Sequence, residues 1–445
     1  MFSYRQALDY LESLINYEKK SDLTYNKRLF NLDRIRLLLK RLGNPHFSLK
    51  TVHIAGTKGK GSTAAIITSI LADAGYKVGL YTSPHLVSPR ERIRICERLI
   101  EKEEFSFFIW KIKKIVDGIK EERRTFSPTF FEVYTSCAFA YFYEKKVDVA
   151  VIEVGLGGRL DATNVITPLV GVITPVSLDH TKQLGNDLIS IAKEKAGIIK
   201  PHSTIVISRQ ERKVLSLLER ICRERKAKFY KIGEDIKFNL KKATPAYQVF
   251  DVKGIKKDYS SLFIPLAGEH QLWNAATAVG VVELLSFYGF KISCENIFQG
   301  IKNVSWPGRI QTIDHTPDVI VDCAHNGASA QYLARFLNSF YKEKKIILVL
   351  SVLKNKDIEA IARALCPLAN RVIVTKINSP RALPVDEIYS KIKRYCTKDP
   401  VKKENLEEAL KIAEEMAGKS GVVCITGSVY LVGEVLSFKG IITEK

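Results

Sequence analysis

The chain has 445 residues, about three times the commonest domain size, so we expect two domains or three. Hydrophobic residues make up 46% and charged residues 26%, a composition typical of globular proteins that excludes the disordered, collagen-like and disulfide-scaffold classes. The net charge of +21 suits an anionic partner such as a nucleotide, a polycarboxylate or a nucleic acid. The basic residues are dispersed along the chain, which favours a solvated basic surface over a nucleic-acid-binding arm.

The sequence carries no sign of export or of a membrane anchor. It does not open with a basic segment followed by an apolar one, and no apolar stretch reaches the roughly 18 residues that a membrane-spanning helix needs. The eight cysteines include no Cys-x-x-Cys pair, so we expect most of them to be buried free thiols. These features predict a cytoplasmic enzyme with no membrane partner.

Short β-branched runs alternate with amphipathic stretches along most of the chain, which predicts an α/β fold with mostly parallel sheets and crossover helices. Residues 227–266 differ, because they are polar, β-prone and weakly periodic, and they predict a small antiparallel insertion. Elsewhere in the first 305 residues, the predicted strands are 51–56, 77–83, 147–155, 169–175 and 204–208, and the predicted helices include 60–74, 129–145, 186–199 and 271–288.

A Trp-Pro-Gly turn within residues 303–309 interrupts this alternation. Four β-branched runs follow the turn, in the segments VIVDCAH, KIILVLSV, NRVIVTKI and GVVCITGS. We therefore place a domain boundary near residue 305, with a larger domain at 1–305 and a smaller α/β domain at 306–445.

The segment HIAGTKGKGST is a β-run that ends in a glycine-rich turn before a helical pattern. Gly56, Gly59 and Gly61 let backbone N–H groups converge on a phosphate, and Lys60 can reach its outer oxygens. The segment does not satisfy the G-x-x-x-x-G-K-[ST] pattern, because position 54 is Ile and Gly61 separates Lys60 from the following serine. It therefore predicts a phosphate-binding loop, with a purely structural turn as the alternative.

Charged side chains also follow predicted strands at the edge where open α/β sheets bind ligands. Glu153 ends the strand in DVAVIEVG, where a carboxylate suits a Mg²⁺ ion held by one or two protein ligands and by phosphate oxygens. A helix cap or a salt bridge is the alternative. Asp179 and His180 follow another strand and would lie beside Glu153 if the two strands are neighbours.

The helical segment 186–200 carries a lysine among its apolar residues. Lys195 lies on the apolar stripe that includes Ile191, whereas Lys193 is about 200° away around the helix and is predicted to be solvated. A buried bare ammonium is unfavourable, so Lys195 must be paired, neutral or modified. A lysine that snorkels from the edge of the stripe is the alternative.

Several polar residues are weaker signals when taken singly. Asn274 in GEHQLWNAA also fits a surface amide, and Arg309 after Trp-Pro-Gly also fits a brace of the linker. The segment VDCAHN ends a predicted strand of the second domain with Asp322, His325 and Asn326. Two sheets with polar strand ends predict a cleft between domains that closes on ATP and a second substrate.

Together these motifs resemble the folylpolyglutamate synthase family of the Mur ligase superfamily, whose members are often also dihydrofolate synthases. The resemblance implies a three-layered P-loop nucleotide-binding domain with a mostly parallel sheet, followed by a smaller Rossmann-like C-terminal domain, with ATP between them. It runs from residue 3 to residue 437 and rests on the segments HIAGTKGKGST, YTSPHLVSPRERIRI, TFFEVYTSCAFAYF, DVAVIEVGLGGRLDATN, SLDHTKQLGNDLISIAKEKAGIIK, GEHQLWNAA, WPGRIQ, VDCAHN and TGSVYLVGEV.

The resemblance also implies the roles of individual residues. The catalytic residues would be Lys60, Lys195, His180 and Arg309. ATP would be bound by Gly56, Thr57, Lys58, Gly59, Lys60, Gly61, Ser62, Asn274, Arg309, Asp322 and His325. Mg²⁺, with two sites expected, would be held by Ser83, Glu153, His180 and a carbamylated Lys195. The folate would contact Pro84, His85, Phe131, Asp161 and Ala162.

The implied reaction begins with transfer of the γ-phosphate of ATP to the carboxylate of a folate, with dihydropteroate as a further candidate acceptor. The amino group of L-glutamate then attacks the acyl phosphate, while Mg²⁺, Lys60 and Arg309 neutralise charge. The family suggests a monomer that acts on small molecules and has no nucleic-acid partner.

Two other readings remain open from the sequence. A peptidoglycan-precursor Mur ligase would share the phosphate loop and the buried lysine. A P-loop NTPase that binds nucleic acid would suit the charge of +21 and predicts steeply salt-dependent binding, but it leaves the polar cluster of the second domain unexplained.

The sequence departs from the family pattern at a few positions. Lys58 stands where the family usually has Asn, and Pro89 and Arg90 stand where Phe-Asn is commoner. Cys323 and Gly327 replace a Gly and a Pro around the Asp and His-Asn of the second domain. None of these changes removes a group predicted to bind metal or phosphate.

Overall fold

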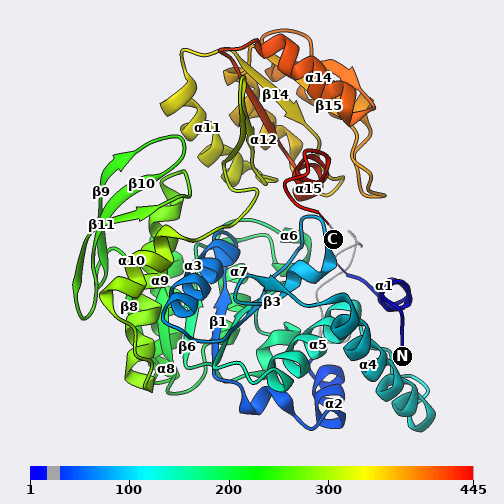
Figure 1. Cartoon of the computed structure of the whole chain (residues 1–445), viewed down its shortest axis with the longest axis vertical. Coiled ribbons are helices and arrows are strands. Elements are labelled where there is room, and N and C mark those ends of the chain that lie inside the picture. Colours follow the sequence, from blue (N-terminus) through cyan, green and yellow to red (C-terminus); the bar gives the residue numbers. More distant parts are fainter. Residues whose placement is uncertain (18–30, 444–445) are drawn as a thin grey trace.

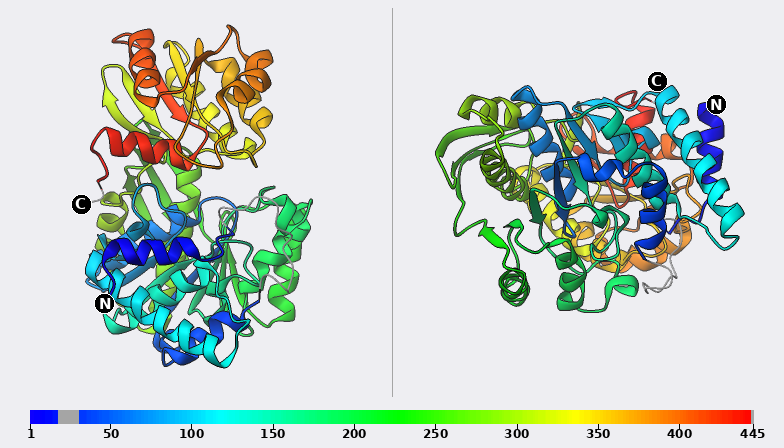
Figure 2. Two further views of the ribbon diagram at one scale, coloured as in Figure 1. Left: turned by 90° about the vertical axis from the view of Figure 1, so that its right-hand side faces the viewer. Right: turned by 90° about the horizontal axis from the view of Figure 1, so that it is seen from below.

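The computed structural model describes residues 1–17 and 31–443, which form two stacked α/β domains. Figure 1 shows the first domain below and the C-terminal domain, coloured yellow to red, above it, and the left panel of Figure 2 shows the same stacking from the side. The predicted fold class is confirmed. In the part of the chain that the structure describes, no helix is both long and apolar enough to cross a membrane.

The first domain is built around an eight-stranded sheet in the order β4-β3-β2-β5-β1-β6-β7-β8. The six strands from β2 to β8 pair in parallel, whereas β3 and β4 continue the sheet antiparallel at one edge. Every residue of β1, β2, β5 and β6 is buried, as expected for parallel strands covered on both faces. The strands are β1 (Thr51–Ala55), β2 (Val78–Tyr81), β3 (Ile93–Ile95), β4 (Arg98–Leu99), β5 (Val149–Glu153), β6 (Val170–Ile173), β7 (Thr204–Ile207) and β8 (Lys228–Lys231).

Helices cover both faces of this sheet and give the domain three layers. On one face α3, α9 and α10 share a core with Val52 and Ile54 of β1. The other face carries a core with α1, α2, α4 and α5 and a second core with α7 and α8. The helices are α1 (Tyr4–Ser13), α2 (Asp33–Arg41), α3 (Lys60–Asp73), α4 (Lys102–Glu122), α5 (Phe130–Glu144), α6 (Thr181–Leu184), α7 (Leu188–Lys195), α8 (Arg212–Glu224), α9 (His270–Leu285) and α10 (Cys294–Lys302).

The segment 227–266 is only partly the antiparallel insertion predicted from its sequence. Its first strand, β8, pairs in parallel with β7 and extends the main sheet, which corrects the prediction. The remaining strands, β9 (Lys237–Ala243), β10 (Gln248–Lys253) and β11 (Asp258–Ile264), form a three-stranded antiparallel sheet at the side of the domain, as predicted. The strand β8 was missed because an edge strand with partly exposed residues has no clear apolar pattern.

The C-terminal domain contains a six-stranded sheet in the order β12-β13-β17-β14-β15-β16, in which only the pairing of β12 with β13 is antiparallel. α11 to α13 share a core with one face of the sheet, and α14 and α15 share a core with the other. The four predicted strands are present, and the short edge strands β12 and β16 are additional. The elements are β12 (Gln311–His315), β13 (Asp318–Val321), α11 (Gly327–Tyr341), β14 (Ile346–Leu350), α12 (Ile358–Leu365), β15 (Arg371–Thr375), α13 (Val385–Ile392), β16 (Val401–Lys403), α14 (Leu406–Ala417), β17 (Val422–Thr426) and α15 (Val429–Phe438).

Candidate active site

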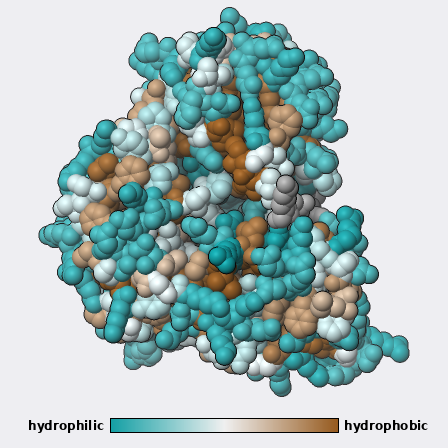
Figure 3. Space-filling view, viewed as in Figure 1, coloured by the Kyte–Doolittle hydropathy of each residue, from teal (hydrophilic) through white to brown (hydrophobic). Residues whose placement is uncertain are grey.

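A cavity of about 730 Å³ lies between the two domains. Its walls come from loops that follow strands β1, β2, β5 and β6 of the first domain and β13, β14 and β17 of the second, so the two sheets point their ligand-binding edges at each other. In the orientation of Figure 1 the surface is mostly hydrophilic, and some hydrophobic side chains appear where the domains face each other (Figure 3). The predicted site residues that line this cavity are Gly56, Thr57, Lys58, Gly59, Lys60, Gly61, Ser62, Ser83, Pro84, Phe131, Glu153, Asp161, Ala162, His180, Lys195, Asn274, Arg309, Asp322 and His325.

The glycine-rich loop joins β1 to α3. A Cβ atom on Gly56 would lie 1.8 Å from the Thr174 hydroxyl oxygen, so no side chain fits there. Gly59 has φ +82°, and a Cβ atom on it would lie 2.3 Å from Oδ1 of Asn274. Close packing therefore demands glycine at both positions, and it brings Asn274 of α9 directly over the loop.

The backbone donors of this loop that are suited to a phosphate lie at the start of α3. The backbone N–H groups of Thr57 and Lys58 donate to the carbonyl oxygen of Pro175, at 2.9 and 3.2 Å, and are thus already used. The first N–H groups of an α-helix have no intrahelical acceptor and carry the positive end of the helix dipole. Because α3 begins at Lys60, these donors belong to the predicted residues Lys60, Gly61 and Ser62.

Lys60 and Glu153 face each other across the end of the sheet. Their Nζ and Oε1 atoms are 3.6 Å apart, and the N–H of Ser83 donates to Oε2 of Glu153 at 3.2 Å. Ser83 follows β2, the parallel neighbour of β5, which explains how two distant segments meet here. Burial raises the pKa of the Glu153 carboxyl, against the opposing charge of Lys60. An additional cation beside Glu153 would stabilise its charged form.

Lys195 is buried, as the apolar stripe predicted, with 4% of its surface exposed, whereas Lys193 is exposed. Its ammonium group donates to the carbonyl oxygen of Gly56 at 2.9 Å, so it lies directly beneath the phosphate loop. Burial, together with the nearby charge of Lys60, lowers the pKa of Lys195 to about 7. A substantial fraction of this amine is therefore neutral near neutral pH.

His180 does not stand on a strand adjacent to Glu153. β1 lies between β5 and β6, so the strand neighbourhood on which the sequence-based expectation depended is wrong. His180 nevertheless lines the same cavity, with 43% of its side chain exposed and Nε2 4.0 Å from Oδ1 of Asp179. Partial desolvation of His180 by the cleft and the charges of nearby lysines lower its pKa to about 3, although Asp179 opposes them. The ring is therefore neutral and able to act as a ligand.

The C-terminal wall presents a buried carboxylate beside a guanidinium. Asp322 accepts hydrogen bonds from the N–H groups of Ile310 and Ala324, both at 2.9 Å. Burial raises the pKa of Asp322, and the charge of Arg309 opposes that change. Arg309 also lies close enough to Glu153 for their charges to interact, so it carries positive charge to the middle of the cleft.

The loop after β5 is held by Asp161. This carboxylate accepts hydrogen bonds from the N–H of Leu156 at 2.9 Å and from the N–H and hydroxyl of Thr163 at 3.0 and 2.5 Å. Because the single hydroxyl proton of Thr163 goes to Asp161, the Thr163 oxygen accepts from Nε2 of His53, 2.8 Å away. The result is a buried chain of hydrogen bonds from the centre of β1 to the cavity wall.

The other predicted folate contacts surround this loop. Phe131 packs against Gly155, where a Cβ atom would lie 2.5 Å from the end of the ring. Ala162 and Pro84 line the cavity. His85 lies outside the cavity lining, and its Nδ1 accepts a hydrogen bond from Arg92 at 3.0 Å.

Two family models match the chain, the Mur ligase middle domain over residues 54–282 and the Mur ligase glutamate ligase domain over residues 308–429. The dihydrofolate synthase/folylpolyglutamate synthase of Bacillus subtilis is 34% identical over 409 residues, which cover 91% of this chain and 94% of that protein. The protein of the same name from Mycobacterium tuberculosis is 36% identical and covers 97% of this chain and 95% of its own length. This chain belongs to the folylpolyglutamate synthase family of Mur ligases.

Solved structures of folylpolyglutamate synthases have the same fold. The Mycobacterium tuberculosis enzyme complexed with ADP matches this chain with a TM-score of 0.90 at 35% identity, and the match covers 98% of each chain. A complex of a folylpolyglutamate synthase with AMPPCP and folate matches with a TM-score of 0.85 at 29% identity and covers 99% of this chain. Like its relatives, this member of the folylpolyglutamate synthase family is a ligase.

Two residues of the site were not predicted from the sequence or were predicted in a lesser role. Lys356 follows β14 and lines the cavity, and Asp179 faces it across the cleft at 3.0 Å. The rule that polar residues after parallel strands form sites would have found Lys356, had it been applied to β14 as it was to β13. Asp179 was noticed only for its nearness to Glu153, and its partners in the other domain had no signal in the sequence.

Proposed function

We propose that this protein joins L-glutamate to folates, and also to dihydropteroate, through an acyl phosphate and with release of ADP and phosphate. The observation that carries the proposal is the interdomain cavity, which has a phosphate loop on one wall and Arg309 and Asp322 of the glutamate ligase domain on the other. The names of the Bacillus subtilis and Mycobacterium tuberculosis relatives include both acceptor activities.

The chemistry explains why the site needs positively charged groups and no protein nucleophile. A carboxylate oxygen is a poor leaving group, so it must first receive the γ-phosphoryl group of ATP. Such a transfer needs positioning and charge neutralisation. Lys60 and the N-terminus of α3 would bind the phosphates from one wall, and Arg309 would neutralise the transferring group from the other.

The residues present fit a magnesium ion. Glu153 is buried, and burial raises its pKa against the charges of Lys60 and Arg309, so a further cation beside it would stabilise its charged form. In residues 1–17 and 31–443, no three His, Cys, Asp or Glu side chains cluster closely enough to hold a metal alone, which fits an ion that takes its other ligands from ATP. Glu153, Ser83 and His180 would hold it. Bound there, the ion would neutralise charge on the phosphates.

Lys195 is proposed to carry a carbamate. Only a neutral amine reacts with CO₂, and a pKa of about 7 keeps a substantial neutral fraction available. The carbamate would convert a cation beneath the phosphate loop into an anion suited to a metal. The contact of the Lys195 amine with the Gly56 carbonyl shows that the side chain already reaches the loop.

The folate would enter on the side of the loop after β5. Phe131 offers a ring face, and Asp161, Ala162 and Pro84 line the adjoining wall. Asp161 is less suited to a direct contact with the folate, because its oxygens already accept hydrogen bonds from its own loop. Its main contribution is to hold that loop in shape for the acceptor.

The deciding experiment measures ADP release with ATP, Mg²⁺ and L-glutamate, with dihydropteroate, tetrahydrofolate or a UDP-muramoyl acceptor in parallel. We expect turnover with both pterin acceptors. Turnover with tetrahydrofolate alone would restrict the protein to polyglutamylation. A response only to the muramoyl compound would overturn the folate assignment while leaving the ligase core intact.

A further inference from the structure

Asp179 lies where the two domains meet, in the loop that follows β6. Only 10% of its side chain is exposed. Oδ2 accepts a hydrogen bond from Nδ2 of Asn326 at 2.8 Å, and Oδ1 accepts one from Nζ of Lys356 at 3.0 Å. Both donors belong to the C-terminal domain, so two hydrogen bonds cross between the domains at one carboxylate.

A third partner comes from the phosphate loop. The Lys58 ammonium lies 3.8 Å from Oδ2 of Asp179. Lys58 is the residue that departs from the Asn usual in the resembling family, and burial lowers its pKa to about 8 while Asp179 opposes the change. Asp179 therefore stands between a lysine of each cavity wall and offsets part of the repulsion between them.

The groups around Asp179 stabilise its negatively charged form. Burial alone would raise the pKa of its carboxyl, but His325, Lys356 and Lys58 outweigh burial and hold that pKa well below its ordinary value. The Nδ1 of His325 contacts the carbonyl oxygen of Cys323 at 2.8 Å and must carry the proton there. The Nε2 atom of His325 lies 3.7 Å from Oδ2 of Asp179, beyond the usual hydrogen-bond distance, so this interaction is weaker than the hydrogen bonds from Lys356 and Asn326.

These contacts matter for the reaction because ATP must touch both walls at once. Lys60 and the start of α3 belong to one domain, and Arg309 and Asp322 stand at the start of the other. We propose that Asp179 is a positioning residue, which clasps the two walls of the cleft through Lys356 and Asn326 and holds Lys58 at the edge of the phosphate loop. This inference rests on one part of the proposed function, the binding of ATP in the cleft.

The test compares D179N and K356M, each of which removes one side of the clasp, with their double variant. K356M is the cleaner arm, because Lys356 lies in the other domain and its loss leaves the loop after β6 intact. K354M is the matched control, since Lys354 lies in the same loop after β14 but is exposed. Thermal unfolding of each variant checks that it folds.

We expect D179N and K356M each to weaken AMPPCP binding, measured by calorimetry, by about tenfold or more, the size expected for loss of a hydrogen bond to a charged group. The KM for ATP should rise by a similar factor in both variants, while the KM for tetrahydrofolate stays unchanged. The double variant should bind AMPPCP no more weakly than D179N alone, because the interaction that K356M removes is already lost in D179N. K58N should have a smaller effect, about two- to fivefold, since it removes only the longer ion pair.

Small-angle X-ray scattering supplies a readout that does not depend on activity. D179N and K356M should show a larger radius of gyration than the parent protein without nucleotide, and K354M should not. Additive losses in the double variant, an unchanged radius of gyration in both single variants, or equal rises in the KM for ATP and for folate would each overturn the clasp. If the parent protein turned over no pterin while the AMPPCP and scattering results held, the proposed function alone would fail.

Discussion

Two aspartates line the same cavity, one buried and one partly buried, and they are stabilised in opposite ways. Asp161 takes its hydrogen bonds from Leu156 and Thr163, residues within five positions of itself. Asp179 takes its hydrogen bonds from Asn326 and Lys356, the latter 177 positions away in the other domain. Burial raises the pKa of Asp161, whereas positive and polar neighbours outweigh burial and lower the pKa of Asp179.

The difference separates two tasks in one site. The Asp161 network lies within the first domain and gives one loop a fixed shape, which suits recognition of an acceptor. The Asp179 network joins the domains, which suits closure on ATP. Substitutions of the two aspartates should therefore affect different substrates, and the following experiments test this division in order of decreasing effect.

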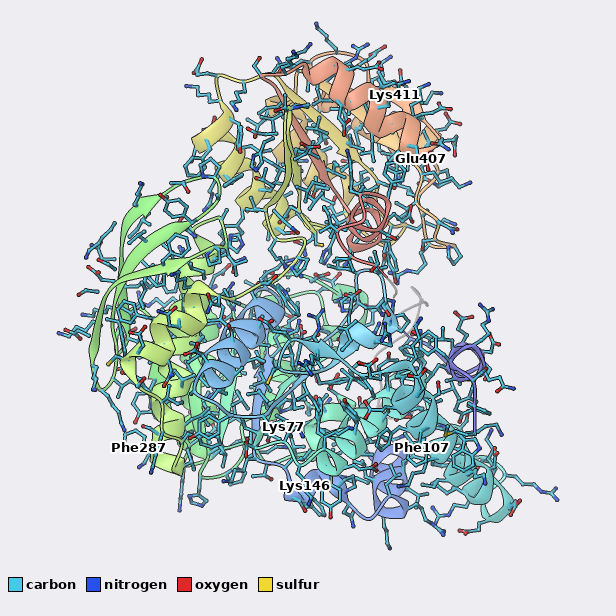
Figure 4. All side chains as sticks on the ribbon, in the orientation of Figure 1. Lys77, Phe107, Lys146, Phe287, Glu407 and Lys411 are labelled. Carbon is cyan, nitrogen blue, oxygen red and sulfur yellow. The ribbon has the colours of Figure 1, made fainter. Side chains whose placement is uncertain are left out.

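The largest effect should come from Lys60, which we expect to serve the chemical step and which belongs to neither network. We expect K60M to lower kcat by about a thousandfold, because it removes a positive charge from the transferring phosphoryl group. ADP release under saturating ATP and tetrahydrofolate measures it. Lys411 lies on α14, away from the junction of the domains in Figure 4, so K411M serves as a surface control. A kcat of K60M within tenfold of the parent value would show that Lys60 is not a catalytic residue.

Asp161 should show the opposite substrate dependence to Asp179. In D161N an amide replaces a carboxylate that only accepts hydrogen bonds, and the loop after β5 loses interactions worth about 2 kcal/mol. We expect the KM for tetrahydrofolate to rise by about tenfold or more while the KM for ATP stays unchanged. Steady-state kinetics with each substrate varied in turn checks this. If the KM for ATP and the KM for tetrahydrofolate rose equally in D161N and in D179N, the two aspartates would not have separate roles.

His53 tests the buried end of the Asp161 network. His53→Leu removes the donor to Thr163, and we expect a loss of about 1 to 3 kcal/mol in the free energy of unfolding. His53→Gln keeps an N–H near the position of Nε2 and should recover part of that loss. Urea unfolding at about pH 7.5 measures both variants. Identical losses for Leu and Gln would mean that packing, and not the hydrogen bond, accounts for the contribution of His53 to stability.

The smallest effect concerns acid stability. Burial, with a contribution from Lys200, lowers the pKa of His53 to about 3, whereas the unfolded chain has the ordinary value of about 6.5. Below about pH 6.5 the unfolded state binds a proton that the folded state does not, so stability falls as the pH falls toward 3. Between about pH 7.5 and 5.5, His53 should account for a loss of about 1.4 kcal/mol, which His53→Gln should abolish. Equal pH dependence in the parent and the variant would contradict this assignment.

Much of the fold could be predicted because its signals are local. The β-branched runs of β1, β5, β6 and β7 are strands, and the stripe that contains Ile191 correctly placed Lys195 in the interior and Lys193 outside. The edge strands β8, β12 and β16 were harder, because partly exposed edge strands have weak patterns. The lateral order of strands was not predictable, so the nearness of His180 to Glu153 depended on the condition that their strands are neighbours, and β1 lies between those strands.

The sequence by itself determined the α/β fold class, the glycine-rich loop before α3, the buried position of Lys195 and the polar residues that end the strands of two sheets. Each of these follows from the spacing of residues that are close along the chain. Only the tertiary structure decided that β1 separates β5 from β6, that Asn274 covers Gly59, and that Asp179 meets Lys356. These contacts join residues far apart in the chain, and packing and charge pairing between distant segments leave no periodic trace in the sequence.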